Sequence, residues 1–258
     1  MIIETLISAD FIIVLTAVLL GCFVKGALGF GLPLIATPIM LFTLPLPEIV
    51  ALLALPIMIA NIQQIWLNRA QWRILKKFWP LVASSTLIML IGAPLMVAID
   101  SRLLGILIGL MIALHAILSS FPLPQFRRRS LTATSLDRFI IPAGIASGIL
   151  GSFSSIYSFP SLQLFMMMRI TKDDLAMLLG VFLSLGYAAL WLGISNAGFP
   201  VGDNLLLSAL MMVPAIAGQQ AGHLARRRFS ETTFRHIVHF ALACAGLTLM
   251  IRGLGSLV

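Results

Sequence analysis

The residue types best suited to chemistry are concentrated in one glycine-rich stretch within the apolar run of residues 5–44. Gly26, Gly29 and Gly31 fall within six residues, and Lys25 directly precedes them. In hydrocarbon no water satisfies the backbone groups that glycines release, so such a break occurs where the backbone lines a cavity. A charged group at the same place is typical of a binding site. The pattern predicts that the helix opens here to bind a ligand.

A second stretch of the same kind follows later, because the spacing of Gly26, Gly29 and Pro38 recurs 122 residues on, ending in Pro160. Helix ends at such breaks carry unpaired N–H groups and about +0.5 of an elementary charge, which favours anions. We expect backbone amides and serine hydroxyls to be the donors. They are Gly26, Gly29, Phe30 and Gly31 in the first break, and Gly151, Ser152, Phe153, Ser154 and Ser155 in the second. The sequence therefore predicts an anion site.

Lys25 allows two interpretations. A lysine near the end of a membrane helix often extends its ammonium group to the lipid headgroups and has no further role. Reaching the headgroups from this position requires the tip of a hairpin to come to the far side of the bilayer. The other interpretation makes Lys25 the counter-charge of an anionic substrate, and both stay open at this point.

Further polar side chains lie inside apolar segments. We expect Asn61, Gln64 and Gln219 to contact the substrate, although hydrogen bonding between helices explains such amides equally well. The positions related to Asn61 in the second half lie around Gly186 and Tyr187 and are less polar. His115, alone in an apolar helix, is expected to be a packing residue, with a proton relay as the alternative.

Composition indicates an integral membrane protein. Hydrophobic residues make up 60% of the 258 residues and charged residues 10%, whereas soluble domains carry about 25% charged residues. At about 20 residues per crossing the chain has room for roughly eight to ten segments. The net charge of +8 comes from Lys and Arg in short loops. Such loops fix topology in the bilayer and indicate no nucleic-acid partner.

The two halves of the chain resemble each other. Residues 47–53 parallel residues 173–179, and Gly92 parallels Gly218 at the same offset of 126. An internal duplication explains these matches, and the expected apolar segments divide accordingly. They lie at about 5–44, 48–67, 78–98 and 103–120, then at about 138–168, 175–194, 204–224 and 236–252. We therefore predict a first membrane repeat at 1–121, a basic cytoplasmic linker at 122–137 and a second membrane repeat at 138–258.

The positive charges indicate how the repeats are oriented. If each glycine-broken block is a single span, the loops at 68–77 and 226–235 lie on opposite sides, and the charges divide nine to seven. If each block is a hairpin, whether re-entrant or crossing twice, they divide fourteen to two. The positive-inside rule favours the second arrangement. It predicts an all-α polytopic protein with two inverted repeats of about four helices, each beginning with a glycine-broken hairpin, and with both termini outside.

Several catalytic classes lack their motifs here. The sequence contains no Gly-x-x-x-x-Gly-Lys-Ser/Thr loop, no His-Glu-x-x-His and no Gly-x-Ser-x-Gly. No two acidic residues share an apolar segment, which argues against a metal site. The one conceivable nucleophile–base pair, Ser152 or Ser154 with His223, has no supporting spacing. We expect no enzymatic activity and no cofactor.

The glycine breaks carry a resemblance to a known family. The pattern Gly26-x-x-Gly29-Phe30-Gly31 with Pro38, its repeat Gly148-x-x-Gly151 with Pro160, and the connector Asn68-Arg69-x-x-Trp72 resemble the TauE/SafE family of sulfite exporters and related permeases. The resemblance covers essentially the whole chain. It departs from the family in the second break, where Ser152-Phe153-Ser154-Ser155 replaces a further glycine cluster.

The resemblance implies a permease of the bacterial inner membrane that moves sulfite, sulfonates or other small organic anions. The expected partners are that anion, the lipid bilayer and protons as a coupling ion, with basic loops in the cytoplasm. An accessory membrane subunit without transport of its own is the alternative, and an intramembrane hydrolase is a distant third.

Overall fold

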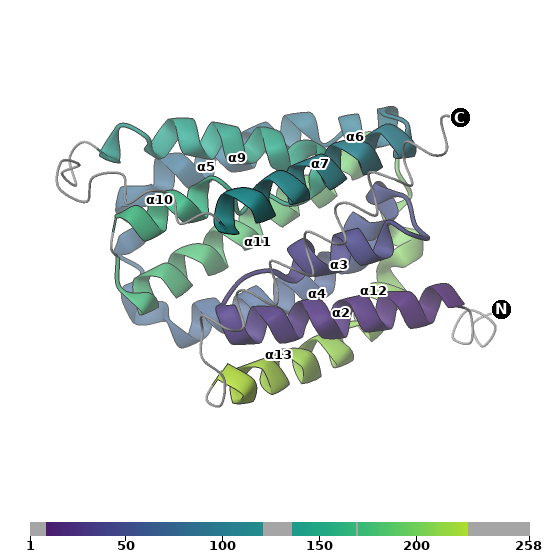
Figure 1. Ribbon diagram of the computed structural model, residues 1–258, viewed down its shortest axis with the longest axis horizontal. Helices are drawn as coiled ribbons and strands as arrows, with labels where there is room; N and C mark the ends of the chain where they lie inside the picture. The colour runs from purple at the N-terminus through teal and green to yellow at the C-terminus, as the bar shows by residue number, and fades with distance from the viewer. Residues whose placement is uncertain (1–8, 121–135, 169, 227–258) are drawn as a thin grey trace. The chain divides into compact units, whose positions relative to one another are not determined.

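The computed structural model describes residues 9–120, 136–168 and 170–226, and every regular element in these ranges is a helix (Figure 1). The first half contains α2 (Ala9–Leu28), α3 (Leu32–Met40), α4 (Leu46–Leu67), η1 (Arg69–Gln71), α5 (Ile74–Gly92), α6 (Leu95–Ala98) and α7 (Ser101–Ser120). The second contains α9 (Ile140–Ser154), α10 (Ser161–Met167), α11 (Lys172–Asn196), η2 (Val201–Asn204), α12 (Leu205–Leu210) and α13 (Met212–Arg226). The segment expected at 236–252 lies outside the described residues.

Helices of membrane-spanning length account for much of the described chain. Four helical stretches are long and apolar enough to cross a bilayer: Phe11–Leu28, Leu46–Leu67, Ile74–Ala98 and Lys172–Asn196. A fifth is formed if Val201–Leu210 and Met212–Ala225, bent by 48°, are one span. The expectation of a polytopic all-α membrane protein is therefore confirmed.

Local sequence signals explain where α11 begins and ends. The hydroxyl of Thr171 accepts a hydrogen bond from the backbone N–H of Asp174 at 3.1 Å, which caps the first turn. Asp173 and Asp174 place negative charge at the positive end of the helix dipole. After Asn196 the chain turns at Gly198, whose φ of +86° suits glycine.

The residues divide into two compact units that interleave along the chain. One consists of Met1–Ala60, Ile99–Ser120 and Pro200–Val258, and the other of Asn61–Ala98 and Phe121–Phe199. Each unit thus combines segments from both halves of the sequence. The division into repeats at 1–121 and 138–258 describes the sequence, and it stays a prediction.

The core of the first unit is the pair α2 and α13. The two helices pack along each other (Figure 1). A Cβ atom added to Gly218 would lie 2.6 Å from the carbonyl oxygen of Leu19, and one on Gly222 would overlap the backbone of Phe23. These contacts follow the same order on both helices, so the helices run parallel. Small residues in the Gly218-x-x-x-Gly222 spacing allow this close approach.

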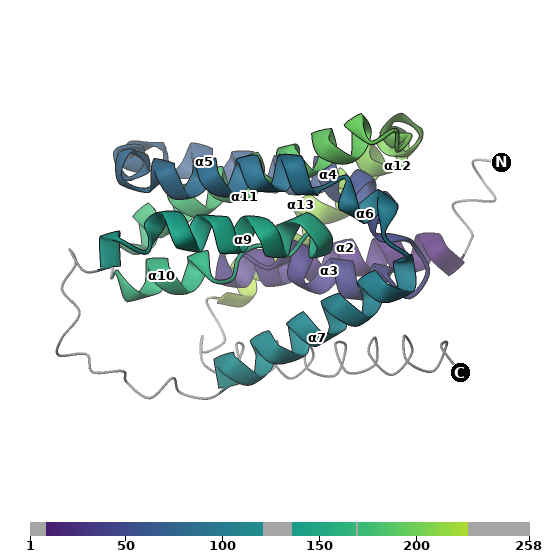
Figure 2. The same ribbon diagram turned by 90° about the horizontal axis from the view of Figure 1, so that it is seen from above.

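The core of the second unit is the pair α5 and α9, which lie side by side in both ribbon views (Figure 1; Figure 2). Gly144 faces Leu81, with 2.5 Å between a Cβ atom built on the glycine and the Leu81 carbonyl oxygen. Gly148 faces Ser85 one turn further along. This pair is therefore also parallel, and it is also closed by glycines four residues apart.

Aromatic rings fill the remaining core of the second unit. Phe165 packs edge-to-face on Phe78 at 5.3 Å and on Phe182 at 6.1 Å between ring centres. Tyr157 packs edge-to-face on Phe182 at 5.4 Å. At the surface, the Nζ of Lys77 lies 2.8 Å from Asp137 and joins the start of α5 to the segment before α9.

Both units contain the same pairing across the halves. In the first unit, α2 from the first half packs on α13, which carries Gly218. In the second unit, α9 from the second half packs on α5, which carries Gly92. Such a pairing is expected of a duplicated chain in which the first helix of each half packs on a helix of the other half. The opposite orientation of the two repeats stays a prediction.

Both glycine-broken blocks fold back as hairpins. A Cβ atom on Gly21 would lie 2.9 Å from the carbonyl oxygen of Leu32, so α3 returns along α2. In the second block the hydroxyls of Ser147 and Ser161 lie 2.7 Å apart, so α10 returns along α9. The second arms have nine and seven residues, or about 13 and 10 Å at 1.5 Å per residue, and are too short to cross a core of about 30 Å.

Aromatic and basic side chains gather at the connector from α4 to α5. Trp66, Trp72 and Trp79 are 66%, 50% and 52% exposed. The guanidinium of Arg69 lies 4.6 Å from the ring centre of Trp66, and the Nζ of Lys76 lies 5.2 Å from that of Trp72. Tryptophan beside Lys and Arg is typical of the boundary between membrane and water.

Candidate functional site

The first break is the backbone between α2 and α3. Gly29 and Gly31 have φ values of +88° and +114°, which other residues rarely adopt. The N–H of Gly29 still donates to the carbonyl of Lys25 at 2.6 Å. By contrast, the N–H groups of Phe30, Gly31 and Leu32 donate no hydrogen bond to any residue that the structure describes. Since Gly31 and Leu32 are buried, the start of α3 presents unpaired donors inside the protein.

Lys25 occupies the last turn of α2, one turn before this break. Its side chain is only 3% exposed. A lysine that extends to the headgroups would leave its ammonium group at the surface of the protein, so burial argues against that interpretation. A buried ammonium group needs compensating partners, and the negative end of the α2 dipole supplies part of this compensation.

Gly26 and Gln219 meet where α2 packs on α13. A Cβ atom on Gly26 would overlap the backbone of Gln219. Gly26 lies inside α2, so its role here is close helix packing, whereas we expected an exposed amide. The side chain of Gln219 is 5% exposed and forms no hydrogen bond among the described residues. The first unit thus brings the backbone of Gln219 next to Gly26, which is the neighbour of Lys25 in the sequence.

The second break, residues 155–160, begins at the end of α9. Ser155, with φ of +59°, closes that helix, and its N–H donates to the carbonyl of Gly151 at 3.0 Å. A helix end of this kind leaves carbonyl groups unpaired, while its amides are bonded within the helix. Gly151, Ser152, Phe153 and Ser154 therefore differ from the expectation of exposed amides.

The serine hydroxyls of this break are also engaged. Ser152 donates to the carbonyls of Gly148 at 2.8 Å and Ile88 at 3.2 Å. Ser154 donates to Leu150 at 2.6 Å and accepts from the N–H of Ile156 at 3.1 Å. Serine in a helix commonly bonds back to the preceding turn, which the sequence expectation did not take into account. Both hydroxyls hold the shape of the break.

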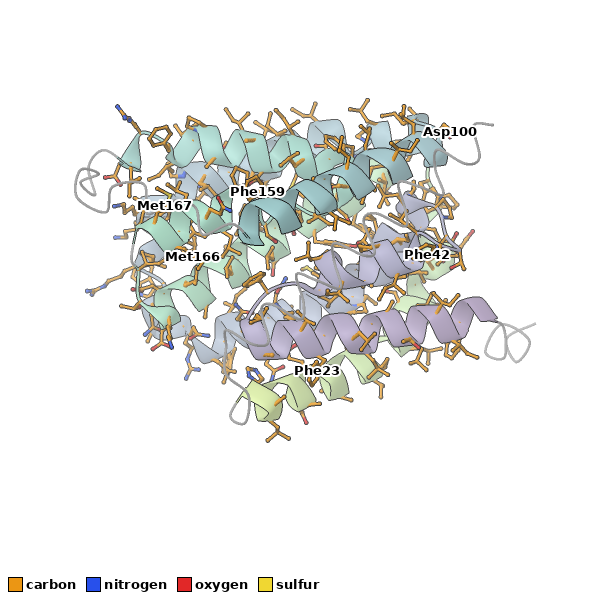
Figure 3. All side chains as sticks on the ribbon, viewed as in Figure 1. Phe23, Phe42, Asp100, Phe159, Met166 and Met167 are labelled. Atoms are coloured by element: carbon orange, nitrogen blue, oxygen red, sulfur yellow. The ribbon has the colours of Figure 1, made fainter. Side chains whose placement is uncertain are left out.

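The short arm after this break is apolar on its outside. Figure 3 shows Phe159 in the connector before α10, and Met166 and Met167 on α10 itself. Met166 and Met167 are 48% and 50% exposed. The first amide of α10 is satisfied, because the N–H of Ser161 donates to the hydroxyl of Ser147 at 3.2 Å. The amide at the start of α10 is thus bonded, whereas the amide of Leu32 at the start of α3 donates to no residue that the structure describes.

Asn61 and Gln64 both lie where α4 meets α11. Gln64 is 8% exposed, and its Nε2 donates to the carbonyl of Ala176 at 2.8 Å. This contact is the helix-to-helix hydrogen bond that was the alternative to substrate contact. Asn61 is 1% exposed and lies beside Gly180 of α11.

Two tyrosines near the second break were not among the expected site residues. The ring of Tyr157 lies against Gly186, and its hydroxyl donates to the carbonyl of Leu183 at 2.5 Å. Tyr187 is completely buried, and its hydroxyl has no partner among the residues described. The signal in the sequence was that these are its only tyrosines and that Tyr187 follows Asn61 by 126 residues.

Comparison with known proteins identifies the family. The model of the family described as Sulfite exporter TauE/SafE matches residues 13–249, nearly the whole chain. The chain belongs to the TauE/SafE family. Members of this family are membrane transporters, so the expectations of a membrane protein, of transport and of this family are confirmed. No curated protein and no solved structure matches the chain significantly.

Membership also bears on the alternative chemistries. A family of permeases is consistent with a protein that is not an enzyme. Within the described ranges no three His, Cys, Asp or Glu side chains come together as metal ligands.

Proposed function

We propose that the protein is a secondary transporter of small anions, namely sulfite, sulfonates or related organic anions, in the bacterial inner membrane. The observation that carries the proposal is the first break. There the N–H groups of Phe30, Gly31 and Leu32, which donate to no residue that the structure describes, follow the buried Lys25 by five to seven residues. The substrate class comes from membership of the TauE/SafE family.

The energetics of the first break favour an anion. A buried donor without a partner costs about 1–3 kcal/mol, and a hydrogen bond to a charged group contributes about 1.5–3 kcal/mol. The start of α3 adds the positive end of a nine-residue helix. An oxyanion would satisfy the amides and pair with the ammonium of Lys25 at once, whereas a cation would meet repulsion from both.

The proposal extends to the rest of the predicted site. Gly29 gives the break its backbone shape, Gln219 contributes an amide group, and Asn61 lies buried in the second half of α4. In the second break, Gly151, Ser152, Ser154 and Ser155 act as the scaffold. We propose that each break lies near the midplane of the membrane, as the helix breaks of transporters built from inverted repeats do.

The orientation is part of the same proposal. The exposed tryptophans and basic residues of the connector from α4 to α5 support a membrane boundary there. The positive-inside rule then places the basic loops in the cytoplasm and both termini in the periplasm. Since the sequence has no nucleotide-binding loop, a proton gradient or the membrane potential drives transport.

Uptake into proteoliposomes tests the function. Labelled sulfite and methanesulfonate are offered with and without a pH gradient to the wild type, to Lys25→Met and to the exposed control Lys77→Met. We expect the wild type and the control to move an anion. Lys25→Met should lose at least about tenfold in uptake, since it removes a hydrogen-bonded charge worth more than about 1.4 kcal/mol.

Two results would contradict the proposal. Equal uptake by Lys25→Met and wild type would remove the lysine from the site. No movement of either anion by the wild type would instead favour the accessory subunit. Thermal unfolding of each variant without anion shows whether a loss of uptake reflects a loss of folded protein.

A further inference from the structure

We propose that the hydroxyl groups of Tyr187 and Ser184, on α11 beside the second break, bind an oxygen atom of the transported anion. The inference rests on the proposed function and names two residues of the second unit that contact the same anion. It replaces the donors that Ser152 and Ser154 were expected to supply, because their hydroxyls already bond to backbone carbonyls.

Both hydroxyls are buried and have no partner in the described part of the chain. Tyr187 is 0% exposed and Ser184 is 7% exposed. Neither the phenol oxygen of Tyr187 nor the Oγ of Ser184 has a hydrogen-bond partner within the parts of the chain that are described. Buried hydroxyls of native proteins are nearly always bonded, so two unpaired ones three residues apart on one helix call for a partner. Residues three apart lie on the same side of a helix.

This part of α11 lies directly against the second break. Tyr157 comes from residues 155–160, the break itself. A Cβ atom on Gly186 would lie 2.6 Å from the Tyr157 ring, and the Tyr157 hydroxyl bonds to Leu183. The turn of α11 that carries Ser184 and Tyr187 is thus fixed to the break by Tyr157. Gly186 is required there, because any side chain would displace that ring.

Hydroxyl groups suit the oxygen atoms of a buried anion. Hydroxyls donate to sulfite or sulfonate oxygens without adding a charge to the apolar interior, and hydrogen bonds to charged oxygens are short and strong. The positions 61 and 187, related by the offset of 126, are both buried polar residues. In the second half the polar group is therefore a phenol where the first half has an amide.

The test compares two single-atom deletions. Tyr187→Phe removes the hydroxyl that has no partner in the fold, and the matched control Tyr157→Phe removes the hydroxyl that bonds to Leu183. For the full-length protein, the half-saturating concentration of sulfite is measured in proteoliposomes. Thermal unfolding in detergent is followed with and without sulfite by the fluorescence of its four tryptophans.

The two variants should differ in both measurements. Tyr187→Phe should raise the half-saturating concentration about tenfold and leave the unfolding temperature without sulfite unchanged or higher. Tyr157→Phe should lower that temperature, because it removes a bonded hydroxyl that fixes α11 to the break, and it should raise the half-saturating concentration less than Tyr187→Phe does. Ser184→Ala should shift the half-saturating concentration in the same direction as Tyr187→Phe.

Two results would overturn the inference. If Tyr187→Phe transports like the wild type, the hydroxyl does not touch the anion. If it unfolds at a lower temperature without sulfite, a structural water holds the hydroxyl. A wild type that neither moves sulfite nor is stabilised by it would refute the proposed function itself, and this inference with it.

Discussion

At the scale of single residues, the first break shows how two glycines turn a membrane helix into a binding feature. Gly29 and Gly31 adopt positive φ values that release three amides, while the hydrogen bond from Gly29 to Lys25 keeps the end of α2 intact. The backbone of Lys25 is thereby held in the last turn of α2, directly before the break. The chemistry of the break depends on the backbone, and substitutions should therefore be judged by their effect on φ.

Gly31→Ala should impair the protein in two ways. At φ of +114° an added methyl group is strained, and it would also lie 3.2 Å from a methyl group of Val24. We expect a loss of about 1–3 kcal/mol in stability and a clear loss of sulfite uptake. Gly105→Ala in α7 is the control, because nothing lies within 4 Å of the added atom. Unfolding temperatures and uptake of both variants check this, and an unimpaired Gly31→Ala would show that the turn is replaceable.

At the scale of elements, each unit is organised by one parallel helix pair closed by glycines. In α13 the spacing is Gly218-x-x-x-Gly222 and in α9 it is Gly144-x-x-x-Gly148. In a bilayer such pairs are held by close backbone packing, because lipid is as apolar as the side chains. Adding even one methyl group at these glycines should therefore lower the stability of the helix pair.

Gly222→Ala and Gly148→Ala should both destabilise the protein by about 1–3 kcal/mol, the usual cost of overpacking. The added methyl would overlap Phe23 in the first case and lie 2.8 Å from Ile88 in the second. Gly202→Ala, with nothing within 4 Å, is the matched control. Thermal unfolding in detergent measures all three. A variant in α13 or α9 as stable as the control would mean that the helices separate without cost.

At the scale of the whole molecule, sidedness tests the inverted arrangement. In the hairpin arrangement Ala70 and Asp173, both exposed, lie in the cytoplasm, and Ala197 lies in the periplasm. Single cysteines at these sites, with Cys22 and Cys244 replaced by alanine, are labelled by an impermeant maleimide in intact cells. We expect label at Ala197→Cys alone. Label at Asp173→Cys without label at Ala70→Cys would point to repeats facing the same way.

Much of the fold was predictable from the sequence, because apolar run length alone determines most helices. The expected segment at 48–67 is α4, observed at Leu46–Leu67, and that at 175–194 is α11, observed at Lys172–Asn196. The division of positive charges between the two sides of the membrane predicted that both glycine-broken blocks are hairpins. The engagement of Ser152 and Ser154 was not predictable, because it depends on which carbonyls the helix end and α5 bring within reach. The interleaved units escaped prediction for a similar reason, since periodicity contains no information on partners.

The pairing of α2 with α13 has a consequence for biosynthesis. The α2 helix leaves the ribosome early. The helix on which it packs, α13, emerges almost two hundred residues later. During this interval the nascent chain holds Lys25 in lipid without its final neighbours. A release of the chain before α13 should thus yield a product that quality-control proteases recognise, so completion of synthesis itself becomes a checkpoint for assembly.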